Sequence, residues 1–271
     1  LNTHPDIAAF VETAYWGRNY VSPATDRYTP TEYRQILDNL ERVDTDNTPA
    51  GAGRGGPYTI LREVVDELVR NQQKVTPRAL FARWARTIAD TEDKKWAVEK
   101  TPHHVNHLER IAEAYPTARF ILMRRNPYDF MLSYKFQGRQ KNRQTRARFR
   151  RNYHPMGCAM VYRGYLQSIR GAIERFPDRV TVLDLRQVKS NPSRALDRVQ
   201  NHLGVSTADA LAAASRNSSF TDDDRPALEA SDLFWMNSLA GLEIHRIPYA
   251  LRPIALEPGC IAHSIARLRE C

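Results

Sequence analysis

Short apolar runs alternate with helically spaced apolar residues over most of this chain. The short runs are typical of buried strands, and they lie at residues 6–11, 95–99, 118–123 and 180–185. The helically spaced stretches predict helices near residues 30–42, 61–69, 78–88, from 127 onward, 156–176, 192–203 and 226–241. Strands that alternate with helices predict an α/β fold, a parallel sheet flanked by helices.

Two of the predicted helices begin at a proline. Thr101 precedes Pro102, and Asn126 precedes Pro127. Proline is well suited to the first position of a helix, and threonine is a common cap before it. The sequence therefore predicts one helix from Pro102 to about Tyr115 and another from Pro127, directly after the strand at 118–123.

Length and composition indicate an ordinary globular protein. The 271 residues are 42% hydrophobic and 26% charged, which suffices for one large α/β domain or two small ones. We assign residues 1–250 to a single domain and residues 251–271 to a C-terminal tail. No apolar run approaches the roughly 18 residues that span a bilayer, and the first residues do not form a secretory signal peptide. Three scattered cysteines favour a reducing compartment, so we expect a cytoplasmic protein.

Positive charge is concentrated at residues 135–151, which we call the basic segment. It contains eight Lys and Arg residues and no Asp or Glu, so the net charge of +9 falls to +1 without it. Such a run indicates contact with a polyanion, a phosphorylated cofactor or an acidic surface, unless it is a solvated loop between helices. Nucleic acid is not expected, because few aromatic residues interrupt the run and no DNA-binding signature is present.

Two other patterns resemble sites but lack the required context. Residues 51–56 match the dinucleotide-binding spacing G-x-G-x-x-G, yet polar residues precede them and Pro57 follows, so no buried strand leads into the glycines. His103, His104 and His107 lie in one predicted helix without a carboxylate or thiol at a ligand-like spacing. We therefore expect no metal site.

Arg125 and Ser133 are the strongest candidates for ligand binding. Arg125 follows the strand at 118–123, and Ser133 lies about two turns into the next helix. The free N–H groups and positive dipole end of a helix that starts at Pro127 face the end of this strand. There an arginine can bind a phosphate with two hydrogen bonds, and a serine can donate one more. The pattern predicts a phosphate-binding site.

The residues around this site resemble those of the sulfotransferases that depend on 3′-phosphoadenosine 5′-phosphosulfate (PAPS). The similarity consists of Glu99-Lys-Thr-Pro-x-His104, a helix, Tyr115-Pro-x-Ala-Arg-Phe-Ile121, and then Arg125-Asn-Pro-x-Asp129 with Ser133. In that family the Arg and Ser of R-[DN]-P-x-D-x-x-x-S bind the 3′-phosphate of PAPS. The resemblance implies this role for Arg125 and Ser133, and a P-loop-kinase-like sulfotransferase fold.

The resemblance also implies two catalytic residues. The first thirteen residues are similar to the segment after the phosphosulfate loop of carbohydrate and tyrosylprotein sulfotransferases, where a glutamate at the position of Glu12 is the catalytic base. Sulfuryl transfer further requires a cation near the bridging oxygen, and Lys100 at a predicted strand end suits this role. No metal is required. His104 is expected to orient the start of its helix rather than to accept a proton.

Two departures from the family pattern matter. The loop that binds the 5′-phosphosulfate, which resembles Pro-Arg-Ser-Gly-Thr-Thr, is expected upstream of Leu1. Where the family often has Tyr-Glu-Asp-Leu, this chain has Leu185-Arg-Gln-Val188. Any cofactor contact made by that tyrosine is therefore in question.

The sequence thus predicts an enzyme that transfers a sulfuryl group from PAPS to an acceptor hydroxyl and releases 3′-phosphoadenosine 5′-phosphate (PAP). The acceptor is a carbohydrate, a lipid or a small natural product, and the basic segment suggests an anionic one. One alternative is a P-loop kinase of a small hydroxyl compound. Another is an inactive polyanion-binding module with the same fold. The Golgi lumen replaces the cytoplasm as the expected location if a membrane anchor precedes residue 1.

Overall fold

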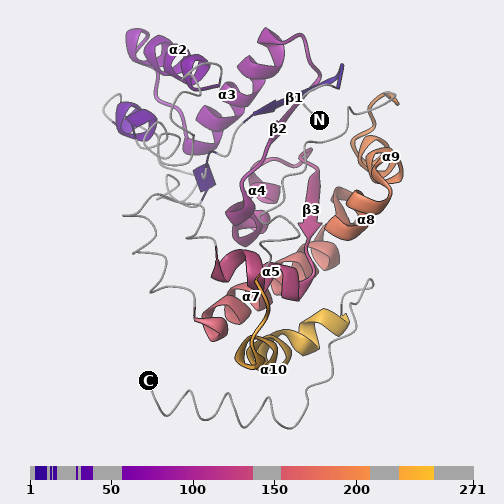
Figure 1. Ribbon diagram of the computed structural model, residues 1–271. Helices are drawn as coiled ribbons and strands as arrows, with labels where there is room; N and C mark the ends of the chain where they lie inside the picture. The colour runs from indigo at the N-terminus through magenta and orange to yellow at the C-terminus, as the bar shows by residue number, and fades with distance from the viewer. Residues whose placement is uncertain are drawn as a thin grey trace. The chain divides into compact units, whose positions relative to one another are not determined.

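The computed structural model describes residues 4–10, 13, 15–16, 29, 32–38, 57–136, 154–207 and 226–246. Their helices and strands belong to two compact units. Unit 1 takes its described residues from 1–118 and 203–212, and unit 2 takes its own from 119–202 and 213–271. Figure 1 labels the helices and strands of both units.

Unit 1 is built on two parallel strands. Strand β1 (Ile7–Phe10) pairs with β2 (Trp96–Glu99) in a register that sets Ile7 opposite Trp96 and Phe10 opposite Glu99. Parallel neighbours need a long crossover connection, and the helices α2 (Pro57–Arg70) and α3 (Pro77–Thr91) lie within it. Helix α3 packs against both strands. It starts at Pro77, where Thr76 caps it by accepting a hydrogen bond from the N–H of Ala79.

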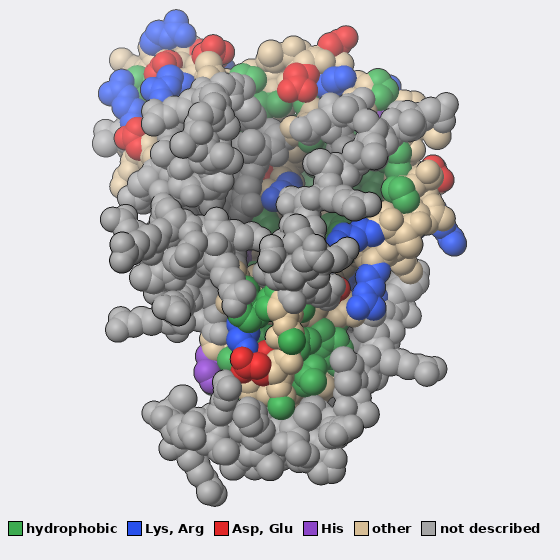
Figure 2. Space-filling view, viewed as in Figure 1, with side chains coloured by type: hydrophobic (Ala, Val, Ile, Leu, Met, Phe, Trp, Pro, Cys, Tyr) green, Lys and Arg blue, Asp and Glu red, His purple; other side chains and the backbone are tan. Residues whose placement is uncertain are grey.

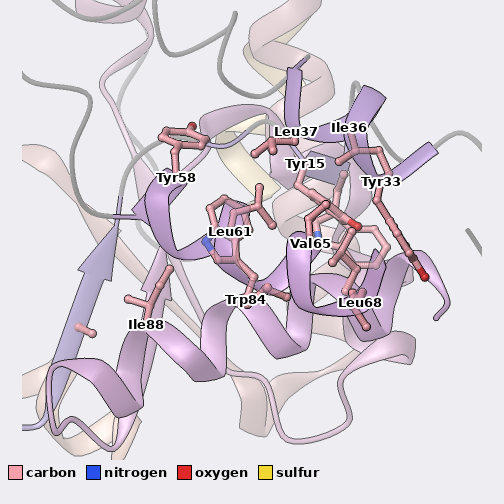
Figure 3. Close-up of a cluster of buried hydrophobic side chains, with 14 residues drawn as sticks. Tyr15, Tyr33, Ile36, Leu37, Tyr58, Leu61, Val65, Leu68, Trp84 and Ile88 are labelled. Carbon is pink, nitrogen blue, oxygen red and sulfur yellow. The ribbon is translucent and has the colours of Figure 1, made fainter. Parts of the chain in front are cut away.

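The core of unit 1 is rich in aromatic residues. Figure 3 shows side chains from α2 and α3 packed together with those of Tyr15 and of the helical residues 32–38. Trp84 is fully buried, and its ring contacts those of Tyr58 and Phe81. Tyr15 is also fully buried, and its hydroxyl donates a hydrogen bond of 2.7 Å to the carbonyl of Pro77. The core therefore holds the chain just beyond β1 against the start of α3.

After β2 the chain forms a 3₁₀ helix, η2 (Pro102–His107), followed by a short α-helix, α4 (Leu108–Ala114). The prediction of one continuous helix from Pro102 to about Tyr115 is therefore wrong in detail. Thr101 precedes Pro102, as expected, but its side chain makes no capping hydrogen bond to this helix. Its hydroxyl instead hydrogen-bonds Glu99 and the N–H of Thr13, so a tertiary interaction replaces the cap.

Unit 2 repeats the parallel arrangement. Strand β3 (Phe120–Arg124) pairs with β4 (Val180–Asp184), and Arg124 stands opposite Asp184 in the register. The helices α5 (Pro127–Lys135) and α7 (Pro155–Arg175) and the 3₁₀ turn η4 (Pro177–Arg179) connect the two strands. Helix α7 packs against α5, β4 and α10 (Ala230–Arg246). The helices α8 (Leu185–Ser190) and α9 (Pro192–Leu203) follow β4.

The predicted α/β fold class and its parallel strand pairing are confirmed. All four predicted strands form, and among the α-helices of the described residues the sequence pattern missed α8. Six residues are too few for helical periodicity to register. Most of the basic segment, the glycines at 51–56 and the tail at 251–271 lie outside the described residues, so their predicted roles and the domain boundary at residue 250 stay predictions. No helix among the described residues is long and apolar enough to cross a membrane.

Replacing Trp84 with alanine tests the core of unit 1. Loss of a large, fully buried ring leaves a cavity, so we expect the free energy of unfolding to fall by about 3–5 kcal/mol. Arg86→Ala is the matched control on the same helix, because the Arg86 side chain is 77% exposed and its pairing with Asp90 contributes about 0.3–0.5 kcal/mol. Urea unfolding of the two variants measures the difference. Equal losses would contradict the assignment of Trp84 to the core.

Candidate functional site

The predicted site residues follow the carboxyl ends of strands in both units. Lys100 comes directly after β2 in unit 1, and Arg125 comes directly after β3 in unit 2. Ser133 lies on α5 of unit 2. Glu12 lies outside the described residues, two positions beyond the end of β1. In parallel α/β folds, ligands bind at this edge of the strands.

A buried carboxylate lies at the end of β2. Glu99 is the last residue of this strand, and its side chain is 10% exposed. One of its oxygens, Oε1, accepts hydrogen bonds from the Thr13 N–H at 3.0 Å and from the Thr13 hydroxyl at 2.8 Å. The Thr101 hydroxyl donates to the same oxygen. Glu99 thereby joins the chain after β1 to the chain after β2.

His104 occupies the other oxygen of Glu99. Its Nδ1 lies 2.9 Å from Oε2, and its Nε2 accepts a hydrogen bond of 3.2 Å from the backbone N–H of Trp16. Since Nε2 accepts, it carries no proton, and Nδ1 must carry the proton that is donated to Glu99. The hydrogen bonds therefore assign a neutral ring with a defined tautomer. The expectation that His104 orients the start of its helix stays a prediction, because these ring contacts are to Glu99 and Trp16.

The environment of Glu99 keeps its carboxyl group ionised. Burial by itself raises the pKa of Glu99, but its hydrogen bond and electrostatic interaction with His104, together with the hydrogen bonds from Thr101 and Thr13, outweigh burial, and the net pKa is lowered. An ionised carboxylate accepts hydrogen bonds only, which matches four donors around its two oxygens. Because the pKa is lowered, the stabilisation is present at neutral pH and is lost only as the pH falls through the lowered value.

Lys100 has a different environment. It is an exposed residue, whereas its neighbours are largely buried: the Glu99 side chain is 10% exposed and Thr101 is 7% exposed. The Glu99 network thus engages the side chains on both sides of Lys100. A cation at a strand end suits the stabilisation of developing negative charge.

The β3–α5 junction in unit 2 has the predicted form. Asn126 is buried and caps α5: its side-chain oxygen accepts hydrogen bonds from the N–H groups of Tyr128 at 2.9 Å and Asp129 at 3.3 Å. Pro127 follows as the first helical residue. The cap fixes the turn that carries Arg125, a half-buried residue. Ser133 is half-buried on the same helix, six residues beyond Pro127.

A tyrosine from α7 holds the backbone of Arg125. The hydroxyl of Tyr162 donates a hydrogen bond of 2.7 Å to the Arg125 carbonyl. Burial raises the pKa of Tyr162 further above its ordinary value, so the phenol keeps its proton and remains a donor. This contact and the Asn126 cap together define where the arginine leaves the strand.

A buried ion pair lies beside Arg125. Arg124 and Asp184 end β3 and β4, and Nη2 of Arg124 lies 3.1 Å from Oδ2 of Asp184. Their side chains are 4% and 8% exposed. The other oxygen of Asp184 caps α8 by accepting from the N–H of Arg186 at 2.9 Å. Arg124 is thus engaged with Asp184 inside unit 2.

The end of α5 is attached to α10 through a third buried carboxylate, that of Asp232. Nζ of Lys135 lies 3.0 and 2.9 Å from the two carboxylate oxygens of Asp232, whose side chain is fully buried. Lys135 is the first residue of the basic segment, and this contact gives it a structural role. The rest of that segment from residue 137 lies outside the described residues. Figure 2 shows Lys and Arg side chains beside Asp and Glu side chains on the described surface.

Sequence reasoning missed three of these interactions. Glu99 stood inside the motif but was given no role, although its position at the end of a strand was a usable signal. Asp184 lies near the end of a predicted strand, and its pairing with Arg124 agrees with the parallel register. Tyr162 gave no signal, because its partner is a backbone carbonyl. Arg186 belongs to the segment Leu185-Arg-Gln-Val188, which departs from the family pattern, and its Nε lies 3.7 Å from the carboxylate of Asp129.

Comparison with known proteins identifies one family. The family model described as the sulfotransferase family matches residues 1–209. None of the curated proteins compared matches the chain. The family assignment therefore rests on the family model.

Solved structures similar to this chain include three sulfotransferases. The sulfotransferase from Alicyclobacillus acidocaldarius is 16% identical with a TM-score of 0.48, and the match covers 90% of this chain and 85% of that one. The sulfotransferase domain of the Synechococcus PCC 7002 olefin synthase is 18% identical with a TM-score of 0.47, over 98% and 95% of the two chains. The sulfotransferase domain from the curacin biosynthetic pathway is 13% identical with a TM-score of 0.44, over 98% of each chain.

Replacing Asp184 with alanine tests the buried ion pair beside Arg125. The change leaves the Arg124 charge buried without this carboxylate, so we expect the free energy of unfolding to fall by about 3–5 kcal/mol. Asp178→Ala is the control, because Asp178 is exposed on η4 just before the same strand. Urea unfolding measures both variants. The double variant Arg124→Met/Asp184→Leu should recover part of the loss, and a single variant as stable as the control would contradict the role given to the pair.

Proposed function

Because the chain belongs to the sulfotransferase family, we propose that it transfers a sulfuryl group from PAPS to an acceptor hydroxyl. The observation that carries the proposal is the β3–α5 junction. There an arginine with a fixed backbone precedes an asparagine-capped helix that carries a serine one and a half turns further on. An arginine, a helix N-terminus and a serine in this order are suited to binding a phosphate group. In the proposal this is a nucleotide phosphate other than the one at the 5′ position.

The donor set at this junction fits the 3′-phosphate of the nucleotide. Arg125 offers a planar guanidinium, Ser133 a neutral hydroxyl, and the start of α5 a positive dipole end. Asp129 in the first turn lies near Arg186, which offsets the negative charge of its carboxylate. The nucleotide supplies the activated sulfuryl group, and the role of Arg125 and Ser133 is to bind and orient it.

Glu12 and Lys100 are the proposed catalytic residues. A general base must reach the acceptor hydroxyl, and Glu99 is poorly suited to this because its oxygens already accept four hydrogen bonds. The family resemblance implies Glu12 as the base, and we propose that role for it. Lys100, exposed directly after β2, would stabilise the negative charge that develops as the sulfuryl group leaves the phosphate.

The acceptor is proposed to be a carbohydrate, a lipid or a small natural product with a free hydroxyl group. The basic segment would attract an anionic acceptor or another polyanion through its long-range field. The few scattered cysteines favour the cytoplasm as the place of reaction.

Replacing Arg125 with alanine should weaken binding of PAP. Hydrogen bonds to charged groups contribute about 1.5–3 kcal/mol each, so we expect affinity to fall by about 10- to 150-fold. Ser133→Ala removes one hydroxyl and should cost less than Arg125→Ala. Arg86→Ala, on the exposed face of α3, is the control and should bind as the wild type does. Isothermal titration calorimetry measures the three variants, and unchanged affinity in Arg125→Ala would overturn the assignment of the phosphate site.

Replacing Glu12 with glutamine should lower turnover by about 10²- to 10⁴-fold, the usual contribution of a positioned general base. Affinity for PAP should change little, because Glu12 is not assigned to nucleotide binding. Glu92→Gln, an exposed residue after α3, is the control and should keep wild-type turnover. Steady-state transfer of labelled sulfate measures all three proteins. Wild-type turnover in Glu12→Gln would remove this residue from the catalytic assignment.

A further inference from the structure

The Glu99 carboxylate binds the two chain segments that carry the proposed catalytic residues. Thr13, whose N–H and hydroxyl both donate to Glu99, directly follows Glu12 in the sequence. Lys100 directly follows Glu99. The two segments are 86 residues apart along the chain at this contact. The Thr13 N–H belongs to the peptide group that joins residue 12 to Thr13, so Glu99 and the Thr101 hydroxyl, 3.0 Å away, act on that peptide directly.

His104 connects Glu99 to the backbone of Trp16 as well. Its Nδ1–H donates to Glu99 while its Nε2 accepts from the Trp16 N–H. The two residues therefore hold the backbone of this segment at Thr13 and again at Trp16. The side chain of Trp16 is buried against Tyr115, Tyr15 and Phe81. Hydrogen bonds and ring packing thus act on the same short segment.

The hydrogen bonds around Glu99 require that its carboxylate carries no proton, because both of its oxygens accept. A glutamine at position 99 would present an amide NH₂ group in place of one oxygen. If that NH₂ faced His104, Nδ1 would have to accept, and the ring proton would move to Nε2, opposite the Trp16 N–H. If it faced the threonines, it would oppose the donors of Thr13 and Thr101. Either orientation breaks part of the network at nearly constant side-chain volume.

We propose that Glu99 and His104 form a positioning pair that holds the chain at Thr13 and Trp16 against the end of β2, next to Lys100, for sulfuryl transfer. The inference rests on the proposed function for the identity of the reaction. It goes further by assigning a task to two residues that touch neither donor nor acceptor in that proposal. A displacement of about 1 Å in a catalytic group can lower a rate about 10²-fold.

Glu99→Gln tests the pair in the full chain. We expect turnover to fall by about 10²-fold, with affinity for PAP within twofold of the wild type and the unfolding midpoint little changed. Glu113→Gln, exposed on α4, is the matched control. A merely structural role predicts that the folded variant keeps its turnover, and that result would overturn the proposal. A parallel loss of PAP affinity would overturn it as well, because Glu99 would then serve nucleotide binding.

Two variants of His104 separate its two hydrogen bonds. His104→Asn keeps a side-chain donor near Glu99, whereas His104→Ala removes both bonds. We expect the asparagine variant to recover a measurable part of the turnover that the alanine variant loses. Equal turnover in the two variants would contradict the donor role given to Nδ1.

Two spectroscopic measurements do not depend on activity. Nitrogen NMR of the wild-type ring should show His104 neutral and protonated at Nδ1, and protonation at Nε2 alone would overturn the proposed pair. Hydrogen exchange at the amides of Thr13 and Trp16 should be slow in the wild type and faster in Glu99→Gln. If the wild type transfers no sulfuryl group, the proposed function fails while these results still decide whether the pair holds the segment.

Discussion

In unit 1 the chain after β1 and the chain after β2 are joined by the hydrogen bonds to the buried carboxylate of Glu99. Burying an ionised group is costly unless donors surround it, and here the donors come from two chain segments. Thr13 belongs to the chain after β1, and Thr101 and His104 belong to the turn after β2. The same donors that make burial of the charge tolerable therefore fix the two strand ends against each other.

In unit 2 the ends of the two strands are joined by a buried ion pair. The ends of β3 and β4 are joined by the buried contact between Arg124 and Asp184, and Asp184 also caps α8. Around the next residue, Tyr162 and Asn126 fix the backbone from which Arg125 extends. In both units a residue of the strand end is engaged in the interior while its immediate neighbour, Lys100 or Arg125, is assigned to the ligand.

The sequence was sufficient for the fold class, the family and the strand ends. The four strands were visible as short apolar runs, and Arg125, Asn126 and Pro127 were correctly read as a strand end, a turn and a helix start. The family resemblance is confirmed by the match over residues 1–209. These features are local, because each depends on residues that are neighbours in the chain.

Interactions between distant segments could not be predicted in the same way. Thr101 had the sequence of a helix cap, yet its hydroxyl bonds Glu99 and the N–H of Thr13, 88 residues away. The hydroxyl of Tyr162 binds a carbonyl 37 residues away, and nothing in its sequence neighbourhood indicates that partner. The tautomer of His104 likewise depends on Trp16, which contacts it only in the folded chain.

The central claim is that the β3–α5 junction recognises a 3′-phosphate, and the wild-type protein tests it most directly. Calorimetric titration should compare adenosine 3′,5′-bisphosphate with adenosine 5′-monophosphate in the same buffer. Two charge-assisted contacts of about 1.5–3 kcal/mol each predict that the bisphosphate binds at least about 10²-fold more tightly. Equal affinities for the two nucleotides would contradict the sulfotransferase assignment and favour a kinase.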